Sequence, residues 1–221
     1  MQVVLRRLRP EDIKQVVEIE REAFSPLWVS TPFKRELNNR YASYLVVCCG
    51  REGDEPATEG AAEREADSPR WRRLGSKFLE LLIKRPQGDS DPQVVAGYVS
   101  VWYQGEEAHI TEIAVRENMR GNGIGELLLI GSLRAAAEYG SKVMTLEVRV
   151  SNFIAQRLYE KYDFKSVGNR KGYYSDNRED AVIMTTSPID TEDYQQLFQK
   201  LQETYRKRRG EITSITGPAE S

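Results

Sequence analysis

Three glycines at alternate positions, Gly121, Gly123 and Gly125, lie between an apolar strand-like segment and an apolar run with the character of a helix. A turn of this kind lets another group approach the backbone closely, because no Cβ atom lies in the way. The start of a helix also leaves backbone N–H groups without partners and carries partial positive charge. The stretch therefore predicts a strand, an anion-binding turn and a helix in succession.

The segments on either side of this turn continue the alternation of strand and helix patterns. Strands are predicted at residues 1–8, 41–49, 94–103, 106–115, 142–150, 163–174 and 180–186. Helices are predicted at residues 9–24, 31–39, 123–139, 151–162 and 190–209. This order predicts a mixed α/β domain with a central mixed sheet of about seven strands and helices on both faces. Its strand–helix–strand passages require parallel neighbours joined by right-handed crossovers.

The chain has 221 residues, which suits one domain with additions. Residues 51–92 shift in composition toward Gly, Glu, Ala and Pro, so they are predicted to be a partly flexible loop insertion that includes a short amphipathic helix in "WRRLGSKFLELLIKR". The domain is predicted to span residues 1–187. Residues 188–221 are predicted to add a C-terminal helix and a tail.

Composition excludes several kinds of partner. The chain has 32 basic and 34 acidic residues, for a net charge of −2, which predicts no attraction to nucleic acid or to a membrane surface. No run approaches the length of a membrane span. Cys48 and Cys49 are adjacent in a strand-like run and are predicted to be buried free thiols, which suits a cytoplasmic protein. His109 is the only histidine, so no metal cluster is expected.

The glycine turn fits neither of two common phosphate-binding motifs. No Gly-Lys-Ser or Gly-Lys-Thr follows it, and G-x-G-x-x-G is not met. The segment "RGNGIG", preceded by "IAV", resembles the acyl-CoA motif of the GNAT superfamily of N-acetyltransferases. The segments "TLEVRVSNFIAQRLYEKYDF" and "KGYYSDNREDAVIM" resemble the RimI-type branch, whose members acetylate the α-amino group of a protein.

This resemblance implies the GNAT fold and acetyl-CoA as the acetyl donor. Amides around the turn would bind the pyrophosphate of coenzyme A, and backbone groups of the preceding strand would hold its pantetheine arm and the acetyl carbonyl. The cofactor-binding residues implied in this way are Ile113, Ala114, Val115, Arg120, Gly121, Asn122, Gly123, Ile124, Gly125, Glu126, Asn152 and Tyr159.

Acetyl transfer to an amine makes three chemical demands. The amine must be neutral, although an α-amino group has a pKa of about 8. The thioester oxygen needs hydrogen-bond donors as it gains charge. The departing thiolate needs a proton.

Two catalytic residues are predicted. Glu147 lies on an otherwise apolar strand, and the resemblance implies that it is the base; from the residues alone it could equally be solvated or paired with Arg149. Tyr159 is implied as the acid that protonates the thiolate, although a helical tyrosine can simply pack in a core. Asn152 can contact the pantetheine arm, cap a helix, or do both through different groups.

Four aromatic residues are predicted to lie near the entrance for the acceptor: Trp28, Phe33, Tyr173 and Tyr174. The resemblance places the paired tyrosines in a loop that lines this entrance, although Gly172 stands where the bacterial pattern often has asparagine. The tyrosines could instead fasten their own loop, and the other two could pack beneath one. His109 is a second-choice base, and a solvent-facing strand residue is the simpler interpretation. The basic segment "YRKRR" is interpreted as a solvated helix end.

The leading hypothesis is an acetyl-CoA-dependent protein N-α-acetyltransferase that works by direct attack in a ternary complex. In the RimI case the acceptor is the N-terminus of a small-subunit ribosomal protein. Two alternatives stay open: an acetyltransferase for a small amine or a lysine side chain, and a CoA-binding interaction module without catalysis. The oligomeric state is not predicted.

Overall fold

Strands and helices follow one another in the predicted order. The computed structural model describes residues 3–24, 31–50, 94–210 and 213–215. Its strands are β1 (Val3–Arg7), β2 (Ala42–Cys49), β3 (Val94–Gln104), β4 (Glu107–Val115), β5 (Val143–Arg149), β6 (Phe164–Arg170), β7 (Ala181–Thr186) and β8 (Thr213–Ile215). Its helices are α1 (Ile13–Ala23), α2 (Phe33–Glu36), α4 (Ile124–Tyr139), α5 (Phe153–Lys161) and α6 (Glu192–Arg209), with 3₁₀ turns η1 (Pro10–Asp12) and η2 (Glu117–Met119). The predicted insertion at 51–92 and Trp28 lie outside the described residues.

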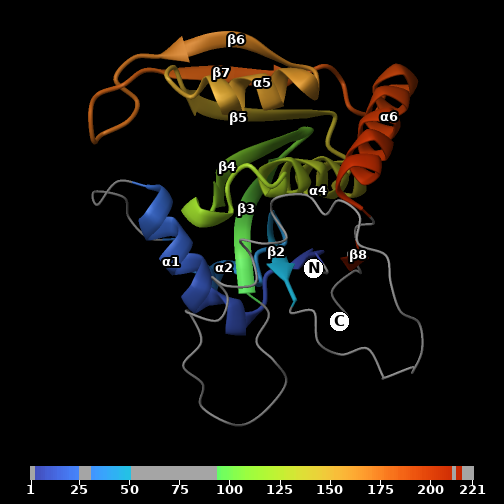
Figure 1. Ribbon diagram of the computed structural model, residues 1–221. Helices are drawn as coiled ribbons and strands as arrows, with labels where there is room; N and C mark the ends of the chain where they lie inside the picture. The colour runs from blue at the N-terminus through green and yellow to red at the C-terminus, as the bar shows by residue number, and fades with distance from the viewer. Residues whose placement is uncertain (1–2, 25–30, 51–93, 211–212, 216–221) are drawn as a thin grey trace, which may run out of the picture. The chain divides into compact units, whose positions relative to one another are not determined.

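The strands form one mixed sheet, which confirms the predicted fold class (Figure 1). The strand order is β6-β7-β5-β4-β3-β2-β1-β8. Within the residues that the structure describes, the parallel pairs are β4–β5 and β1–β8, and β4 reaches β5 through α4, the crossover that the sequence predicts. In the described part of the chain the sheet has eight strands, where about seven are expected. The additional strand is β8, which lies in the segment predicted as a tail and pairs with β1.

Each face of the sheet carries a hydrophobic core under its own helices. On one face, buried Val16 and Ile19 of α1 pack with Tyr98 of β3. On the other face, Leu128 of α4 and Phe198 of α6 belong to a larger cluster that also includes side chains of α5. The prediction of helices on both faces is therefore confirmed.

Helix α4 is apolar around most of its surface because it lies between the sheet and α6. Its residues 127–130 are at most 1% exposed. A Cβ atom on Gly131 would come within 2.8 Å of the Leu5 side chain and 3.1 Å of the Leu45 side chain, so a larger residue would require these buried side chains to shift. Helix α6 covers the outer side of α4 and turns Tyr194, Phe198 and Tyr205 inward.

The pairing of the two central parallel strands ends halfway along them. β4 pairs with β5 only over residues 107–110 and 143–146. Beyond that point residues 147–149 of β5 pair with β7, whereas residues 112–115 of β4 pair with β3. The end of β4 therefore has an edge that no strand covers in the described part of the chain. Residues 113–115, which are predicted to bind the cofactor, form this edge, and the predicted base Glu147 directly follows the last β5 residue that pairs with β4.

Candidate active site

The glycine turn, defined as residues 120–125, joins η2 to α4 where the sequence predicts it. Gly121 and Gly123 both have a φ of +79°, in the left-handed region that residues with a Cβ atom rarely adopt. Helix α4 begins at Ile124, directly after Gly123, and has no side-chain cap. Its first N–H groups therefore face the turn without side-chain partners, which is an arrangement that suits an anion.

Two predicted cofactor-binding side chains hold the backbone of this turn. Asn122 donates a hydrogen bond from its amide nitrogen to the carbonyl oxygen of Met119, at 3.1 Å. Arg120 donates from Nε to the carbonyl oxygen of Val115, at 3.3 Å. Arg120 thus occupies one of the backbone groups predicted to hold the pantetheine arm.

The uncovered edge of β4 suits an extended amide-bearing group. Residues 113–115 pair with β3 on their other side. The approach to β3 is close, because a Cβ atom on Gly97 would lie 2.7 Å from the carbonyl oxygen of Ala114. The remaining edge can accept main-chain-like hydrogen bonds in the way that a sheet edge accepts an added strand.

Glu147 is a buried carboxylate with two charged or chargeable partners. Its side chain is 6% exposed. Oε2 lies 3.0 Å from Nε2 of His109, and Oε1 lies 2.9 Å from a guanidinium nitrogen of Arg170. The alternative of a solvated glutamate or a pair with Arg149 is therefore wrong. The sequence gives no signal for Arg170, which comes from β6.

His109 continues this contact into a short hydrogen-bonded chain. Its Nδ1 lies 2.7 Å from Oγ1 of Thr145, and that hydroxyl donates to Oε1 of Glu107 at 2.6 Å. A threonine hydroxyl has a single proton, so Thr145 accepts from an N–H at Nδ1. Nδ1 is thus engaged with Thr145, and Nε2 lies against Glu147. The side chain of His109 is 32% exposed, so it faces solvent in part and is also a partner of Glu147.

Tyr159, the predicted acid, points from α5 into the larger core. It is 5% exposed, and its ring centroid lies 5.7 Å from that of Phe164. Its hydroxyl makes no hydrogen bond to the described residues. Burial raises the pKa of Tyr159, and the neighbouring Tyr174 raises it further. The hydroxyl therefore stays protonated at neutral pH, which is the form that a general acid needs.

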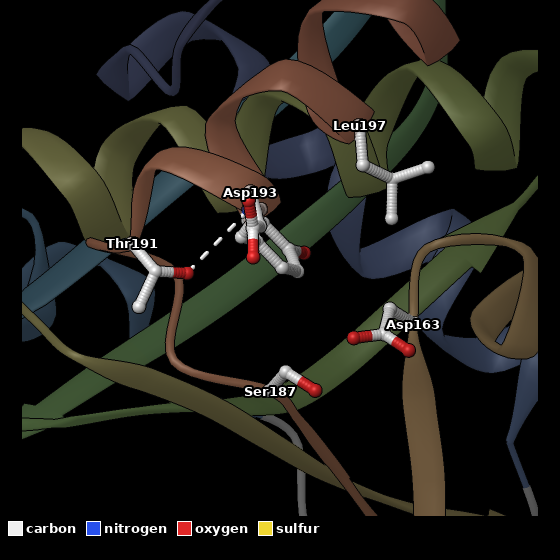
Figure 2. Close-up of a pocket in the computed structure, with 6 residues that line it drawn as sticks. Asp163, Ser187, Thr191, Asp193 and Leu197 are labelled. Atoms are coloured by element: carbon white, nitrogen blue, oxygen red, sulfur yellow. Dashed lines mark hydrogen bonds between the residues drawn. The ribbon is translucent and has the colours of Figure 1, made fainter.

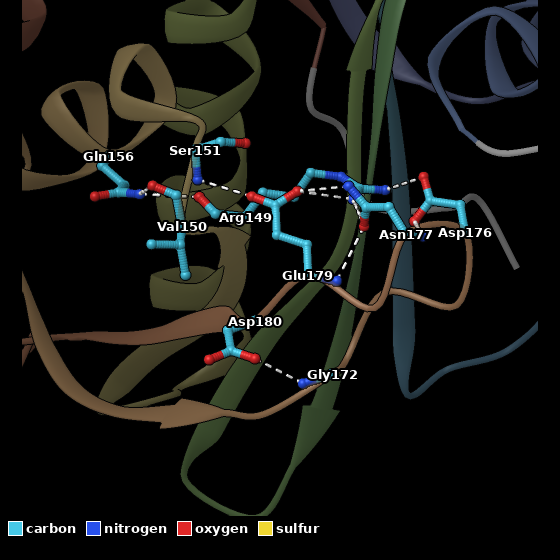
Figure 3. Close-up of polar contacts among 9 residues, drawn as sticks. All are labelled: Arg149, Val150, Ser151, Gln156, Gly172, Asp176, Asn177, Glu179 and Asp180. Carbon is cyan, nitrogen blue, oxygen red and sulfur yellow. Dashed lines mark hydrogen bonds and ion pairs between the residues drawn. The ribbon is translucent and has the colours of Figure 1, made fainter.

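Arg149 does not pair with Glu147. It contacts the loop between β6 and β7 instead (Figure 3). Its guanidinium contacts Oδ2 of Asp176 at 2.8 Å and Oε2 of Glu179 at 3.1 Å. It also lies 3.8 Å from the ring centroid of Tyr174. Hydrogen bonds from Ser151 and from Arg149 lower the pKa of Glu179 to about 2, so this carboxylate stays charged at neutral pH.

The other end of the same loop depends on a left-handed residue. Gly172 has a φ of +58°, and its N–H donates to Oδ1 of Asp180 at 2.7 Å. Asparagine adopts this conformation more readily than most residues. The backbone requirement therefore accounts for a glycine at a position where the RimI-type pattern often has asparagine.

The paired tyrosines lie beside Glu147. The rings of Tyr173 and Tyr174 meet edge to face with centroids 5.2 Å apart, and Tyr173 is 47% exposed. Arg170, which contacts Glu147, also lies 5.7 Å from the ring centroid of Tyr173. Burial raises the pKa of both tyrosines, with a smaller contribution from the charge of Glu147. Arg170 thus lies near both the predicted base and one of the predicted entrance residues, Tyr173.

The remaining predicted residues divide between the site and the core. Asn152 caps α5, because its Oδ1 accepts from the N–H of Ala155 at 3.1 Å, while its amide nitrogen has no partner among the described residues. Phe33 is 1% exposed and meets Tyr44 and Tyr98 edge to face. It leaves no surface for an acceptor, so the packing alternative describes it. Trp28 lies outside the described residues.

Glu112 is a second buried carboxylate that the sequence does not single out as a site residue. It is 7% exposed and accepts hydrogen bonds from the hydroxyls of Thr31, at 2.7 Å, and Tyr98, at 2.8 Å. Burial raises its pKa, although both hydrogen bonds act against this. Glu112 contacts the core beneath α1, and it lies two residues past the end of the β4–β5 pairing.

A separate pocket lies at the start of α6 (Figure 2). It is lined by Asp163, Ser187, Thr191, Asp193, Tyr194 and Leu197. Thr191 caps α6 there, because its hydroxyl oxygen accepts from the N–H of Tyr194 at 3.4 Å. None of the predicted site residues lines this pocket, so it is distinct from the candidate active site.

Two kinds of feature are missing from the described part of the chain. It contains no group of three or more histidine, cysteine, aspartate or glutamate side chains placed to hold a metal ion. None of its helices is both long and apolar enough to cross a membrane. Cys48 and Cys49 are buried free thiols, as predicted.

The fold and the site define a class of protein. The sequence model of the Acetyltransferase (GNAT) family matches residues 13–164, a range that includes α1, α4, α5 and the glycine turn. The chain belongs to this family of acetyltransferases, as its motifs indicate.

The chain is similar to several known N-acetyltransferases within this family. The chain is 34% identical, over 81% of its length and 92% of the other protein, to the proposed ribosomal protein bS18-alanine N-acetyltransferase of Bacillus subtilis. It is 46% identical to an N-alpha-acetyltransferase of Saccharolobus solfataricus, over 35% of its own length and 47% of that protein. The crystal structure of the ribosomal-protein-S18-alanine N-acetyltransferase of Escherichia coli shares its fold, with a TM-score of 0.60 at 22% identity over 86% of this chain and 96% of that one.

Proposed function

We propose that this protein acetylates the N-terminal α-amino group of another protein, of the ribosomal-protein-alanine type, with acetyl-CoA as the donor. The observation that carries the proposal is the position of Glu147, a buried carboxylate beside the uncovered end of β4 and the paired tyrosines. The names of the Bacillus and Saccharolobus relatives support an α-amino acceptor on a protein. We assign the catalytic domain to residues 1–187.

The residues present fit a coenzyme A molecule. A Cβ atom on Gly121 would meet no other atom within 4 Å, so the turn is open to an incoming group. The N–H groups at the start of α4 would bind the pyrophosphate, and the edge of residues 113–115, where Arg120 already contacts the Val115 carbonyl, would hold the pantetheine arm. GNAT acetyltransferases use acetyl-CoA, which supplies an activated thioester when it is bound.

Glu147 is the group that would make the acceptor nucleophilic. An α-ammonium group has a pKa of about 8, so near neutral pH it must lose a proton before attack. The Oε atoms of Glu147 can take this proton directly or through one water. Arg170 and His109 hold the carboxylate in place, because each contacts one of its oxygens.

Tyr159 holds the proton that a leaving thiolate needs. Its hydroxyl has no partner among the described residues, and we propose that it donates to the sulfur atom of the thioester. Cys48 and Cys49 are 0% and 3% exposed in β2, so neither thiol is accessible to carry the acetyl group. We therefore propose direct attack of the amine in a ternary complex. Buried thiols also suit a reducing compartment, which supports a cytoplasmic reaction.

A peptide panel tests the proposal. Peptides with varied first residues, including an alanine-first peptide with the N-terminal sequence of bS18, are incubated with acetyl-CoA beside α-blocked twins that carry a free lysine. We expect acetylation only of free α-amino groups. Glu147→Gln and Tyr159→Phe should each lower kcat by about 10²–10⁴-fold, as expected for the loss of a general base or acid.

Matched controls use the same chemistry away from the site. Glu160→Gln removes an exposed carboxylate from α5, and Tyr139→Phe removes an exposed hydroxyl from α4. Both should keep wild-type turnover. Acetylation of the blocked lysine peptides or of small amines would replace the acceptor in this proposal. Coenzyme A binding without turnover of any amine would identify a non-catalytic module.

A further inference from the structure

The last turn of α6 lies against the glycine turn, although α6 is outside the region matched by the GNAT family. The Tyr205 hydroxyl donates to the carbonyl oxygen of Gly123 at 3.2 Å. The Arg209 guanidinium donates to the carbonyl oxygen of Gly121 at 3.2 Å. Two side chains from one helix turn therefore hold two carbonyls of the turn that would bind phosphate.

These bonds fix the direction in which the amides of the turn point. A trans peptide unit is planar, so its C=O and N–H point in opposite directions. When Arg209 holds the carbonyl of Gly121, the N–H of Asn122 in the same unit must point away from α6. Glycines leave this unit free to rotate, so a partner that fixes the carbonyl is needed to present the amide.

The fit between the two turns is close. A Cβ atom on Gly123 would lie 3.0 Å from Nε of Arg209 and 3.4 Å from the ring of Tyr205. Tyr205 is 4% exposed, so its ring is packed and its hydroxyl is directed by the core. The interpretation of "YRKRR" as a solvated helix end is therefore wrong for Tyr205, whereas Arg209 is exposed and also contacts the glycine turn.

The same helix turn also neutralises an acidic group next to the glycine turn. Glu126 lies in the first turn of α4, where its charge would repel a phosphate. It contacts Lys161 of α5, the Tyr162 hydroxyl at 2.8 Å and the Arg208 guanidinium at 3.3 Å. Two cations around one carboxylate leave this region with a net positive charge.

We propose that the last turn of α6 is a working part of the coenzyme site, in which Tyr205 and Arg209 are positioning residues for the glycine turn. They orient the amides that bind the pyrophosphate, and Arg208 offsets the charge of Glu126. The proposal rests on the proposed use of coenzyme A, and it assigns a role to the chain beyond the family domain.

Binding of coenzyme A to the full-length protein, measured by titration calorimetry, tests this role without any acceptor. Arg209→Ala should weaken the affinity by about five- to tenfold, since it removes a charge-assisted hydrogen bond that orients the turn. Tyr205→Phe should weaken it by about two- to fivefold, since only a neutral hydrogen bond is lost. Pantetheine, which carries no phosphate, should bind the variants and the wild type equally well.

Lys207→Ala is the matched control, because it removes one positive charge from the same helix turn at an exposed position. A change in general electrostatic attraction would affect Lys207→Ala and Arg209→Ala alike and would fade at high salt. A positioning role predicts a selective effect of Arg209→Ala that persists in about 0.5 M NaCl, well above the ionic strength at which surface charges are screened. Melting temperatures and helical circular dichroism confirm that α6 stays folded in each variant.

The outcomes separate this inference from the proposed function. Unchanged coenzyme A affinity in Arg209→Ala and Tyr205→Phe, or equal losses in Arg209→Ala and Lys207→Ala, overturns the positioning role and leaves the acetyltransferase intact. Failure of the wild-type protein to bind coenzyme A overturns both. Selective loss of coenzyme A binding together with unchanged pantetheine binding supports the role, whatever amine the enzyme acetylates.

Discussion

Two glycine-to-alanine substitutions only two residues apart should change stability in opposite directions. Gly125 lies inside α4, where an added Cβ atom would make an ordinary contact 3.8 Å from the Val115 side chain. Alanine is the better helix former by up to about 1 kcal/mol, partly because glycine has more conformational freedom in the unfolded chain. Gly125→Ala should therefore raise the free energy of unfolding by about 0.5–1 kcal/mol.

Gly123→Ala should do the reverse. Its φ of +79° costs an L-residue about 1–2 kcal/mol, and the new Cβ atom would also press on Arg209 at 3.0 Å. The two variants should thus differ by about 2–3 kcal/mol in the free energy of unfolding. For a chain of this size that corresponds to about 4–12 °C in Tm.

Urea denaturation followed by circular dichroism measures both variants. The midpoint should move up for Gly125→Ala and down for Gly123→Ala, with the m-value unchanged in each. Equal shifts of the two midpoints would refute the reasoning, because they would mean that neither the left-handed φ nor the contact with α6 limits the residue at position 123.

Three further predictions concern individual side chains. Burial raises the pKa of Glu112, so the folded state holds its proton more tightly than the unfolded chain, and the wild type should lose stability relative to Glu112→Gln as the pH rises from about 4 to 7. A difference in urea midpoints between the two proteins that stays constant with pH would contradict this. Burial also raises the pKa of Cys48 and Cys49 to about 11, so dithionitrobenzoate should modify these thiols only after the protein unfolds. Rapid reaction of the native protein would show that β2 opens. His109→Ala removes one of the two groups that hold Glu147, so it should lower kcat/KM by about 10–100-fold and leave the affinity for coenzyme A unchanged. Wild-type turnover of this variant would show that Arg170 alone is sufficient to hold Glu147.

The sequence predicts the order of strands and helices because the apolar periodicity and the glycine turn are local signals. The resemblance of the sequence to the RimI-type branch also predicts that Glu147 and the paired tyrosines belong to one site. The partners of Glu147 are not local. Arg170 and His109 come from β6 and β4, on opposite sides of β5 in the sheet order, and only the strand order brings them to one carboxylate.

Glu112 shows a different limit. Side chains on a regular strand alternate between the two faces of a sheet, which would give Glu112 the same face as the core residues Ala108 and Ile110. A register shift between β3 and β4 intervenes at Ser100 and Val101. Beyond it Glu112 contacts Tyr98 in the opposite core. An extra residue in one strand leaves no mark in the pattern of hydrophobic residues, so the core that this carboxylate faces could not be predicted.

The pairing of β8 with β1 has a consequence for how the protein is made. Residues 213–215 pair with residues 4–6, so this contact joins segments from nearly opposite ends of the sequence. During synthesis the outer edge of β1 has no partner strand until the ribosome has released residues 213–215. Contacts of such long sequence separation form slowly, and an unpaired edge strand invites association with other chains. The nascent protein therefore passes through a stage in which most of its sheet can form while one edge remains open, and completion of this edge is a late event of folding.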